Sequence, residues 1–398
     1  MAINRLEKSK CTGCYACYNA CPKNCITMEK DEEGFAYPKI NLDQCNDCGL
    51  CESSCPILNK VITKQNESKP AVYAAWSLNE EVRVNSTSGG LFSELAIYIL
   101  NQGGYVCGAR YGENQKIEHC LIQSVHDLSS IRQSKYAQSE VGLVYKEIRE
   151  RLNNSETVLF CGTPCECAGL INFLKIKYEK LFVIDFVCRG SNSPKVYEKF
   201  LEYLEVKHRS KVKKVWFKNK TYGWNRFSTK VEFEDGQSYL EDRNHDIYIL
   251  GYIKYNLYMR PSCANCQFKE LRVSDITLAD FWGVKLSDPS LDIEKGTSLV
   301  MIHSSKGNDL FEHIKANIFC ESKTMEEALA GNSSIFTSPV MSSKRNYFFK
   351  NLDFMPYNEL MKKCYKEKLS VKFNKNIKRV LRCCDFLVSR AIKTLKIL

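Results

Sequence analysis

The chain has 398 residues, 26% of them charged and 44% hydrophobic, which is enough for two or three globular domains with a large core. No segment reaches the roughly 18 consecutive apolar residues of a membrane-spanning helix, and no apolar targeting segment is expected before the first cysteine motif. Twenty-one cysteines without a secretion signal indicate metal ligands and reduced thiols in a cytoplasm, not disulfides.

Eight of the nine cysteines among residues 1–55 form one pattern twice, C-x2-C-x2-C-x3-C-P. In such a pattern three thiolates bind one [4Fe–4S] cubane, and the fourth cysteine ligates the other cubane. A zinc site would instead favour isolated C-x2-C pairs. The ninth cysteine, Cys25, is expected to be a small buried residue. We therefore predict an α+β ferredoxin-like module over residues 1–62, with one cluster held by Cys11, Cys14, Cys17 and Cys55 and the other by Cys45, Cys48, Cys51 and Cys21.

After a polar linker at residues 63–70, apolar runs alternate with helical patterns. A strand is expected at residues 71–77, and a polar Gly-Gly turn at 85–90 opens a helix over 91–101. Residues 213–218 and 228–233 are typical of antiparallel strands. The alternation predicts an α/β domain or a close pair of them. We divide it into regions 71–150 and 151–335, followed by a basic helical tail at 336–398.

A second set of cysteines lies in loops of the α/β part. Cys165 and Cys188 each follow a predicted strand, at the carboxyl end where ligand sites of α/β sheets gather. Cys263 and Cys266 form a C-x2-C pair. Together the four suffice for one further cluster or one zinc ion. Two nearby cysteines could substitute for members of this set, namely Cys161 and Cys167.

Seven segments between residues 71 and 303 carry recognisable motifs: 86–93 (STSGGLFS), 134–139 (SKYAQS), 162–165 (GTPC), 185–188 (DFVC), 260–263 (RPSC), 274–283 (SDITLADFWG) and 296–299 (GTSL). In this order they resemble the family of coenzyme F420 hydrogenase/dehydrogenase beta subunits, in a form fused to a two-cluster ferredoxin. The resemblance covers most of the chain but not its final sixty residues.

The resemblance implies an α/β flavin- and cluster-binding domain, which holds FAD beside a third [4Fe–4S] cluster. Backbone N–H groups of a Gly-Gly turn can approach a pyrophosphate, and a lysine near a flavin ring can stabilise its reduced anionic form. The polar turn is also compatible with an ordinary helix cap. The implied ligands of the third cluster are Cys165, Cys188, Cys263 and Cys266, and the implied flavin contacts are Ser88, Gly89, Gly90, Ser134, Lys135, Tyr136 and Gln138.

The chain departs from the family pattern at two positions. Arg189 stands where the family usually has histidine, and an arginine cannot give up a proton near neutrality. Glu166 stands where glutamine is frequent. Asp275 and Asp280 are the remaining carboxylates in the motifs, and none of the six histidines lies in one, so we name no catalytic residue.

The positive charge of the chain is concentrated at its C-terminal end. Residues 340–398 hold 15 Lys and Arg against 4 Asp and Glu, whereas the rest of the 398-residue chain is neutral. Apolar residues between 377 and 395 follow helical spacing, which predicts a basic amphipathic helix. Such a helix can contact an anionic membrane surface from the cytoplasmic side, or pack on the protein body. Nucleic-acid binding is not expected, because aromatic residues are not interleaved with the charges.

These features predict an iron–sulfur flavoprotein oxidoreductase. Electrons pass between the ferredoxin clusters and FAD to a two-electron acceptor, either the deazaflavin coenzyme F420 or another small substrate, with surface-polysaccharide biosynthesis as one setting. The alternative is a non-catalytic electron-transfer subunit of a larger hydrogenase or dehydrogenase complex. The expected partner is accordingly a redox protein or a small-molecule acceptor. A structural zinc protein is hard to reconcile with two complete cubane motifs.

Overall fold

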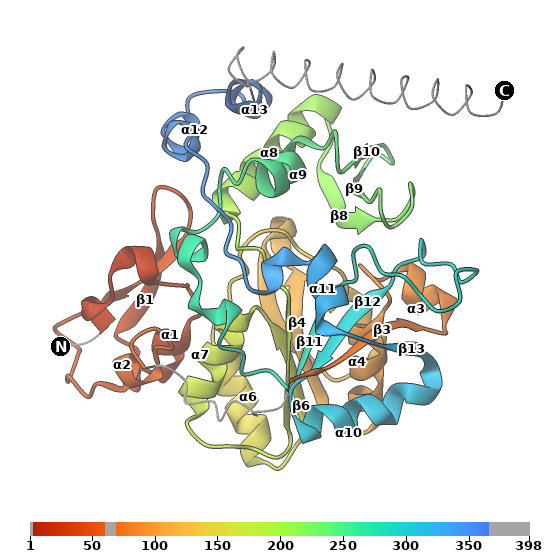
Figure 1. Cartoon of the computed structure of the whole chain (residues 1–398). Helices are drawn as coiled ribbons and strands as arrows, with labels where there is room; N and C mark the ends of the chain where they lie inside the picture. Colours follow the sequence, from red (N-terminus) through yellow and green to blue (C-terminus); the bar gives the residue numbers. More distant parts are fainter. Residues whose placement is uncertain (1–2, 60–68, 366–398) are drawn as a thin grey trace.

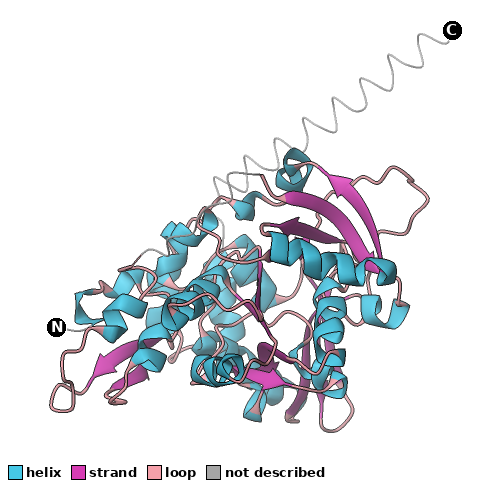
Figure 2. Ribbon diagram, turned by 90° about the horizontal axis from the view of Figure 1, so that it is seen from below, coloured by secondary structure: helices cyan, strands magenta, loops and turns pink. Residues whose placement is uncertain are grey.

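The computed structural model describes residues 3–59 and 69–365. The cluster module lies at one end, beside an eight-stranded sheet with helices on both faces, and a three-stranded sheet with its own helices lies over the large sheet (Figures 1 and 2). No helix in these two described ranges is long and apolar enough to cross a membrane. The predicted basic helix beyond residue 365 lies outside the described residues.

The cluster module is built from two similar halves. Each half has a short helix that begins one residue before the third cysteine of its motif, after a residue in the left-handed conformation: Tyr15 at φ 62° in the first half and Gly49 at φ 70° in the second. The repeated backbone conformation reflects the repeated cysteine spacing. The elements are α1 (Ala16–Ala20), α2 (Leu50–Ser54) and the antiparallel pair β1 (Ile26–Lys30) and β2 (Ala36–Ile40).

The large sheet has the strand order β13-β3-β12-β11-β7-β6-β4-β5. Its four central strands, β11, β7, β6 and β4, are parallel neighbours, and the outer strands pair antiparallel. Both predicted regions of the α/β part contribute strands to this sheet, so they fold as one unit. The strands are β3 (Ala71–Ser77), β4 (Tyr105–Tyr111), β5 (Ile117–Ile122), β6 (Val158–Gly162), β7 (Leu181–Phe186), β11 (Ile276–Asp280), β12 (Ser298–Ile302) and β13 (Ile318–Lys323).

Apolar faces of helices cover the sheet on both sides. On one face, α4 (Leu91–Asn101) and α10 (Ser305–Ile314) bury their apolar side chains against the strands. On the other, α6 (Val144–Asn153) and α7 (Pro164–Leu174) form a core that also contains Cys14, Tyr15 and Ala16 of the cluster module. The module is therefore fixed against α6 and α7 by a shared core. Shorter helices are α3 (Glu80–Val84), α5 (Leu128–Ile131) and α11 (Met325–Gly331).

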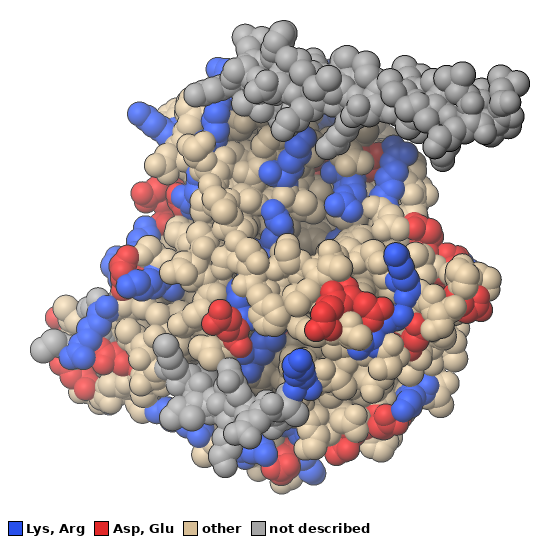
Figure 3. All heavy atoms as spheres, viewed as in Figure 1, with Lys and Arg blue, Asp and Glu red and all other residues tan. Residues whose placement is uncertain are grey.

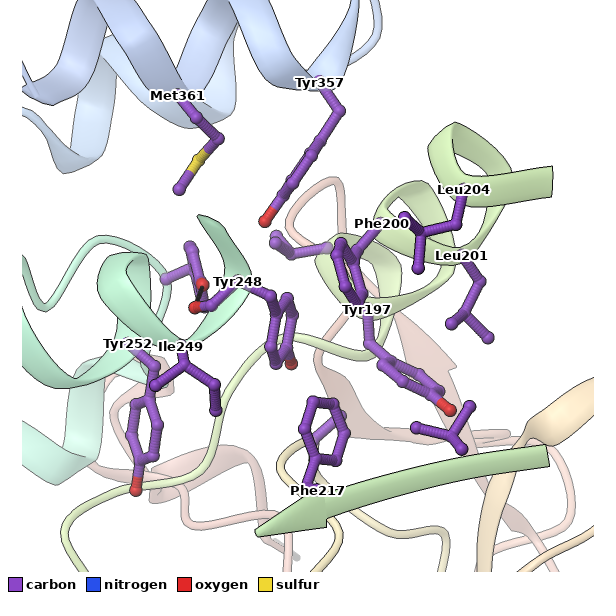
Figure 4. Close-up of a cluster of buried hydrophobic side chains, with 14 of the residues drawn as sticks. Tyr197, Phe200, Leu201, Leu204, Phe217, Tyr248, Ile249, Tyr252, Tyr357 and Met361 are labelled. Carbon is purple, nitrogen blue, oxygen red and sulfur yellow. Dashed lines mark hydrogen bonds between the residues drawn. The ribbon is translucent and has the colours of Figure 1, made fainter. Parts of the chain in front are cut away.

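The three-stranded sheet has its own aromatic core. Tyr357 and Met361 point from α13 toward Phe200 of α8 and toward Tyr248 (Figure 4). Residues 345–365 thus belong to the folded body, so any separate tail begins later than the predicted residue 336. The elements are α8 (Pro194–His208), β8 (Val212–Asn219), β9 (Ser228–Phe233), β10 (Ser238–Asp242), α9 (Ile247–Ile249), α12 (Arg345–Asn351) and α13 (Tyr357–Tyr365).

Candidate functional site

The first set of ferredoxin cysteines meets in the interior of the cluster module. Burial and the neighbouring thiol of Cys55 raise the pKa of Cys14 to about 12. The pKa of Cys17 is raised well above its ordinary value by burial and then by the other thiols of the set. A small cavity between them is lined by apolar side chains and by Cys11, Cys14, Cys17 and Cys55. The structure therefore brings together the first predicted ligand set, including its fourth cysteine from the other motif.

The second set lies closer to solvent. Cys48 is exposed and Cys45 is half-buried, whereas Cys21 and Cys51 are buried. The ninth cysteine, Cys25, is buried as predicted, and its sulfur lies 3.3 Å from that of Cys21. Burial and the adjacent Cys21 thiol raise the pKa of Cys25 to about 12. The two cluster sites thus differ in their environment: the first is enclosed, and the second is open at Cys48.

The four loop cysteines of the α/β part also converge. Burial and the Cys263 thiol raise the pKa of Cys188 to about 12, and Cys266 acts in the same direction. Cys165, in the first turn of α7, has its pKa raised by burial, by Glu166 and by the thiols of Cys266 and Cys188. In Cys165 and Cys188 the neutral thiol is therefore favoured, whereas a bound metal would favour the thiolate.

Local structure places two of these four thiols, Cys165 and Cys263. Thr163 and Glu166 form a capping box that starts α7 at Pro164, so Cys165 lies in its first turn; the Thr163 N–H donates to Glu166 Oε2 at 2.7 Å. The Ser191 N–H donates to the Cys263 sulfur at 3.3 Å. Of the two predicted substitutes, Cys167 is fully buried and its thiol contacts the Gly162 and Ile184 carbonyls instead.

No three Cys, His, Asp or Glu side chains within residues 3–59 and 69–365 lie close enough together to hold a single metal ion. A cubane is larger than one ion and separates its four thiolates more widely.

The first and third thiol sets lie next to each other. Gln267, which follows Cys266, donates from Nε2 to the Pro56 carbonyl at 3.2 Å, and Pro56 follows Cys55. Cys14 contacts Gly169 of α7, one helical turn after Cys165. The second thiol set approaches α7 at the end away from Cys165, where Lys175 donates from Nζ to Ser53 Oγ of α2 at 2.9 Å.

A cavity of about 470 Å³ opens at the carboxyl ends of β6, β7 and β11. Its volume is in the range of ligand pockets, and its position is the usual one in α/β sheets. Figure 3 shows a hollow between the two sheets with Lys and Arg side chains around it. Cys188 lines the cavity, so the third thiol set forms part of its wall. Six of the seven predicted flavin contacts also line it, namely Ser88, Gly90, Ser134, Lys135, Tyr136 and Gln138.

The seventh predicted flavin contact, Gly89, packs against the sheet. Its N–H donates to Ser298 Oγ at 2.9 Å, and a Cβ atom there would lie 2.4 Å from the Ala75 carbonyl oxygen. Lys220 anchors the same turn by donating to the Ser88 carbonyl at 2.7 Å. Gly90 then begins α4 at φ 92°, and no side chain caps this helix. The first turn of α4 lines the cavity. The Ser93 and Glu94 N–H groups donate to the Gly90 carbonyl, which leaves those of Leu91 and Phe92 able to bind an anion.

The cavity has a surplus of positive charge. Burial lowers the pKa of Lys135 to about 7, and its amine donates to the Arg132 carbonyl at 2.7 Å. Four cations that line the cavity have no carboxylate partner among the described residues, namely Arg132, Lys135, Arg189 and Arg243. An anionic ligand therefore fits the cavity.

A buried ion pair lies at the base of the three-stranded sheet. Lys218 of β8 contacts Asp280 at the end of β11, and Trp224 donates to the same carboxylate at 2.9 Å. Burial is the largest single influence and lowers the pKa of Lys218, but Asp280 and Tyr136 together outweigh it, so the net shift is upward. Lys218 thus stays charged beside the cavity, and Asp280 holds it there.

The cavity also contains an acid–base pair that the sequence did not indicate. His119 of β5 is buried, its Nδ1 lies 3.0 Å from Ser139 Oγ, and its Nε2 lies 3.9 Å from Glu166 Oε2. Burial lowers the pKa of His119, so the neutral imidazole is favoured. No local motif surrounds His119, and only the pairing of β4 with β5 and β6 brings it to Glu166.

The remaining motif residues have positioning roles. Arg189 donates to the Ile253 carbonyl at 2.7 Å and to Asn256 Oδ1 at 2.9 Å, so it fixes the loop before residue 257. Asp275 accepts from the Val183 N–H at 2.9 Å and from Ser304 Oγ at 2.7 Å, which ties β11 to β7 and to the start of α10.

The fold and the converging thiols define an iron–sulfur protein of the oxidoreductase type. Residues 10–58 match the 4Fe-4S dicluster domain, residues 72–146 the N-terminal domain and residues 155–328 the C-terminal domain of the coenzyme F420 hydrogenase/dehydrogenase beta subunit. The chain belongs to this family and carries an N-terminal dicluster domain. The resemblance inferred from the motifs is thereby confirmed.

Individual relatives match mainly through the dicluster domain. An uncharacterized ferredoxin of Methanocaldococcus jannaschii is 38% identical over 69 residues, which are 16% of this chain and 88% of that protein. The ferredoxin-type protein NapF of Haemophilus influenzae is 41% identical over 71 residues, 17% of this chain and 36% of that protein, so the match spans about a third of NapF. A solved chain of the F420-reducing [NiFe] hydrogenase complex from Methanosarcina barkeri has 19% identity and a TM-score of 0.44, over 75% of this chain and 90% of that one.

Proposed function

We propose that this protein is an iron–sulfur flavoprotein oxidoreductase with three [4Fe–4S] clusters and one FAD. In this proposal single electrons enter at the ferredoxin clusters and leave in pairs to a small two-electron acceptor, such as the deazaflavin coenzyme F420. The observation that carries it is the position of Cys188, which belongs to the third thiol set and also lines the 470 Å³ cavity. A cluster at this set would border a flavin in the cavity.

The arrangement of the thiol sets supports a defined electron path. The second set is open to solvent at Cys48, the first is enclosed, and the contacts Gln267–Pro56 and Cys14–Gly169 join the first set to the third. Electrons would then pass from the second cluster to the first, to the third and on to the cavity. The reverse direction uses the same path.

The cavity fits FAD through its charge and its donors. The uncapped N-terminus of α4 offers backbone N–H groups to a diphosphate, and the unpaired cations balance its charge. Lys218 keeps its positive charge, whereas Lys135, with a pKa of about 7, is partly neutral. Because Lys218 is already paired with Asp280, we assign the balance of negative charge in the cavity to the unpaired arginines, Arg132, Arg189 and Arg243. When bound, FAD supplies the step between one-electron and two-electron transfer.

A second candidate function is electron transfer to a separate catalytic subunit. The exposed Cys48 and the neighbouring Leu42, whose surface is 69% exposed, would suit contact with a redox protein. Relatives of the dicluster domain include pyruvate synthase subunits, which are parts of larger enzymes. Turnover of a small acceptor by the isolated protein supports the enzyme, whereas reduction without turnover supports the subunit.

Anaerobic purification with iron, sulfide and flavin analysis tests the proposal. About 12 Fe and one FAD per chain are expected, because three cubanes hold about four Fe each. About 8 Fe without flavin would contradict it. Cys263→Ala is expected to remove about four Fe and to leave the ferredoxin signals intact. Cys320→Ala is the matched control, since this cysteine of β13 lies outside all three sets and should keep every iron.

A further inference from the structure

A single arginine joins the first cluster site, the third cluster loop and the cavity wall. Arg260 is 0% exposed, and its backbone begins the loop that carries Cys263. Its Nε donates to the Cys11 carbonyl at 2.7 Å, and its Nη1 donates to Gln138 Oε1 at 2.9 Å. Nη2 donates to the Ala36 carbonyl at 3.0 Å. Three separate segments of the chain therefore converge on one guanidinium.

The positive charge of Arg260 has no carboxylate partner among the described residues. Its guanidinium lies 4.2 Å from the centre of the Tyr37 ring, which gives partial compensation. A fully buried, unpaired charge is costly unless another group balances it. A [4Fe–4S] cluster with four thiolates carries net negative charge, and Cys11 is one of the ligands proposed for the first cluster. The charge of Arg260 also acts on the Cys263 thiol of the third set, so the first cluster, at the Cys11 turn, and the third cluster together supply the counter-charge that this arginine lacks.

The two cysteine motifs differ at the position that faces Arg260. In the first motif a Cβ on Gly13, at φ 68°, would lie 2.7 Å from both Arg260 Nη1 and Gln138 Nε2. The equivalent residue of the second motif is the exposed Asp47, at φ 50°. The side-chain hydrogen bonds of Arg260 go to Cys11, Gln138 and Ala36, and none of them reaches the second motif. The close contact with Arg260 is therefore specific to the first cluster site.

This difference has an electrostatic consequence. Burial alone disfavours the extra negative charge of a reduced cluster, which would make the enclosed first cluster harder to reduce than the open second one. A fixed positive charge beside the first cluster acts in the opposite direction. We propose that Arg260 is a positioning residue that raises the reduction potential of the first cluster, so that an electron passes from the reduced second cluster to the oxidised first one. This inference rests on the three-cluster function proposed above.

Redox titration of the intact holoprotein, followed by electron paramagnetic resonance, tests the inference. Cys48→Ser perturbs the second cluster and so assigns the signals. Arg260→Gln is expected to shift the first-cluster signal to lower potential and to leave the second-cluster signal in place. Arg260→Lys keeps the charge and should restore most of the wild-type potential. An equal shift in Arg260→Lys and Arg260→Gln, or no shift in Arg260→Gln, would overturn the inference.

Two further variants guard against a merely structural effect. Gln138→Glu leaves Arg260 in place but sets a carboxylate beside it, and we expect the same selective shift even if Arg260→Gln fails to fold. An unchanged first-cluster potential in Gln138→Glu overturns the proposal. Arg345→Gln is the matched control, because Arg345 also bridges the cluster module to the body but is paired with Glu33, with Nη1 at 2.6 Å from Oε1. It should leave both potentials unchanged. Absence of cluster signals in the wild type would instead count against the proposed function.

Discussion

The sulfur of Cys14 lies directly over Gly169 of α7: a Cβ atom on residue 169 would come within 2.9 Å of it. The close approach lets the first cluster site lie one helical turn from Cys165. We expect Gly169→Ala to force the cluster module away from α7, at a cost of about 1–3 kcal/mol for overpacking. The variant should have a lower melting temperature and a preferential loss of iron from the first cluster.

Gly103→Asn provides the control for that substitution. Gly103 adopts φ 74°, a Cβ atom there would meet no other atom within 4 Å, and Asn tolerates this conformation. Wild-type iron content in both variants would show that Cys14 and Gly169 are less tightly packed than the structure indicates.

The buried pair of Lys218 and Asp280 gives a second prediction. Their side chains are only 7% and 12% exposed, so removing one partner leaves the other charge uncompensated. Asp280→Asn should lower the free energy of unfolding by about 3–5 kcal/mol. Glu202→Gln, which breaks the exposed pair Lys199–Glu202, should lower it by at most about 1 kcal/mol. Thermal unfolding measures both. Similar effects of the two substitutions would show that Lys218 finds another partner.

Short-range sequence patterns predicted the parts of this site that depend on spacing. Two complete cysteine motifs specified the ferredoxin module, and apolar runs followed by loops placed Cys165 and Cys188 at the carboxyl ends of β6 and β7. The antiparallel strands β8 and β9 are also among the elements that the sequence predicts.

Other features depend on contacts between distant segments. Arg260 meets Cys11 across 249 positions, and Lys218 meets Asp280 across 62. His119 lies on an unremarkable strand and gains a role only through its distance to Glu166. Helix α13 was assigned to a basic tail by its charge, yet its apolar face completes the aromatic core around Tyr248. Local composition could not reveal these packing partners.

The pH dependence of stability should report on Lys135. Its pKa is lowered by burial to about 7, against about 10.4 in an unfolded chain. Between these pKa values the unfolded state binds more protons than the folded state, so the stability rises with pH from about 7 toward 10.4. Below about pH 7 the destabilisation caused by burying charged Lys135 is complete. Lys135→Met should flatten this rise in melting temperature.

Lys220 has a pKa lowered to about 7 by the same cause, so a smaller rise of the same sign should persist in Lys135→Met. Lys177→Met is the control, since this side chain is 81% exposed and its loss should leave the profile parallel to that of the wild type. A wild-type profile that is flat between pH 7 and 10 would rule out a lowered pKa for either buried lysine.

The spare thiol of Cys25 gives the last prediction. Its sulfur lies 3.3 Å from that of Cys21 and close to Cys45, so it can reach the second cluster when Cys21 is absent. Cys25→Ala alone should keep all the ferredoxin iron, because the four predicted ligands remain. Cys21→Ala should retain part of the second cluster through Cys25, whereas Cys21→Ala/Cys25→Ala should lose about four Fe. Iron analysis and electron paramagnetic resonance of the three variants measure this. Equal losses in the single Cys21→Ala and the double variant would show that Cys25 cannot replace Cys21 and is held near it only by packing.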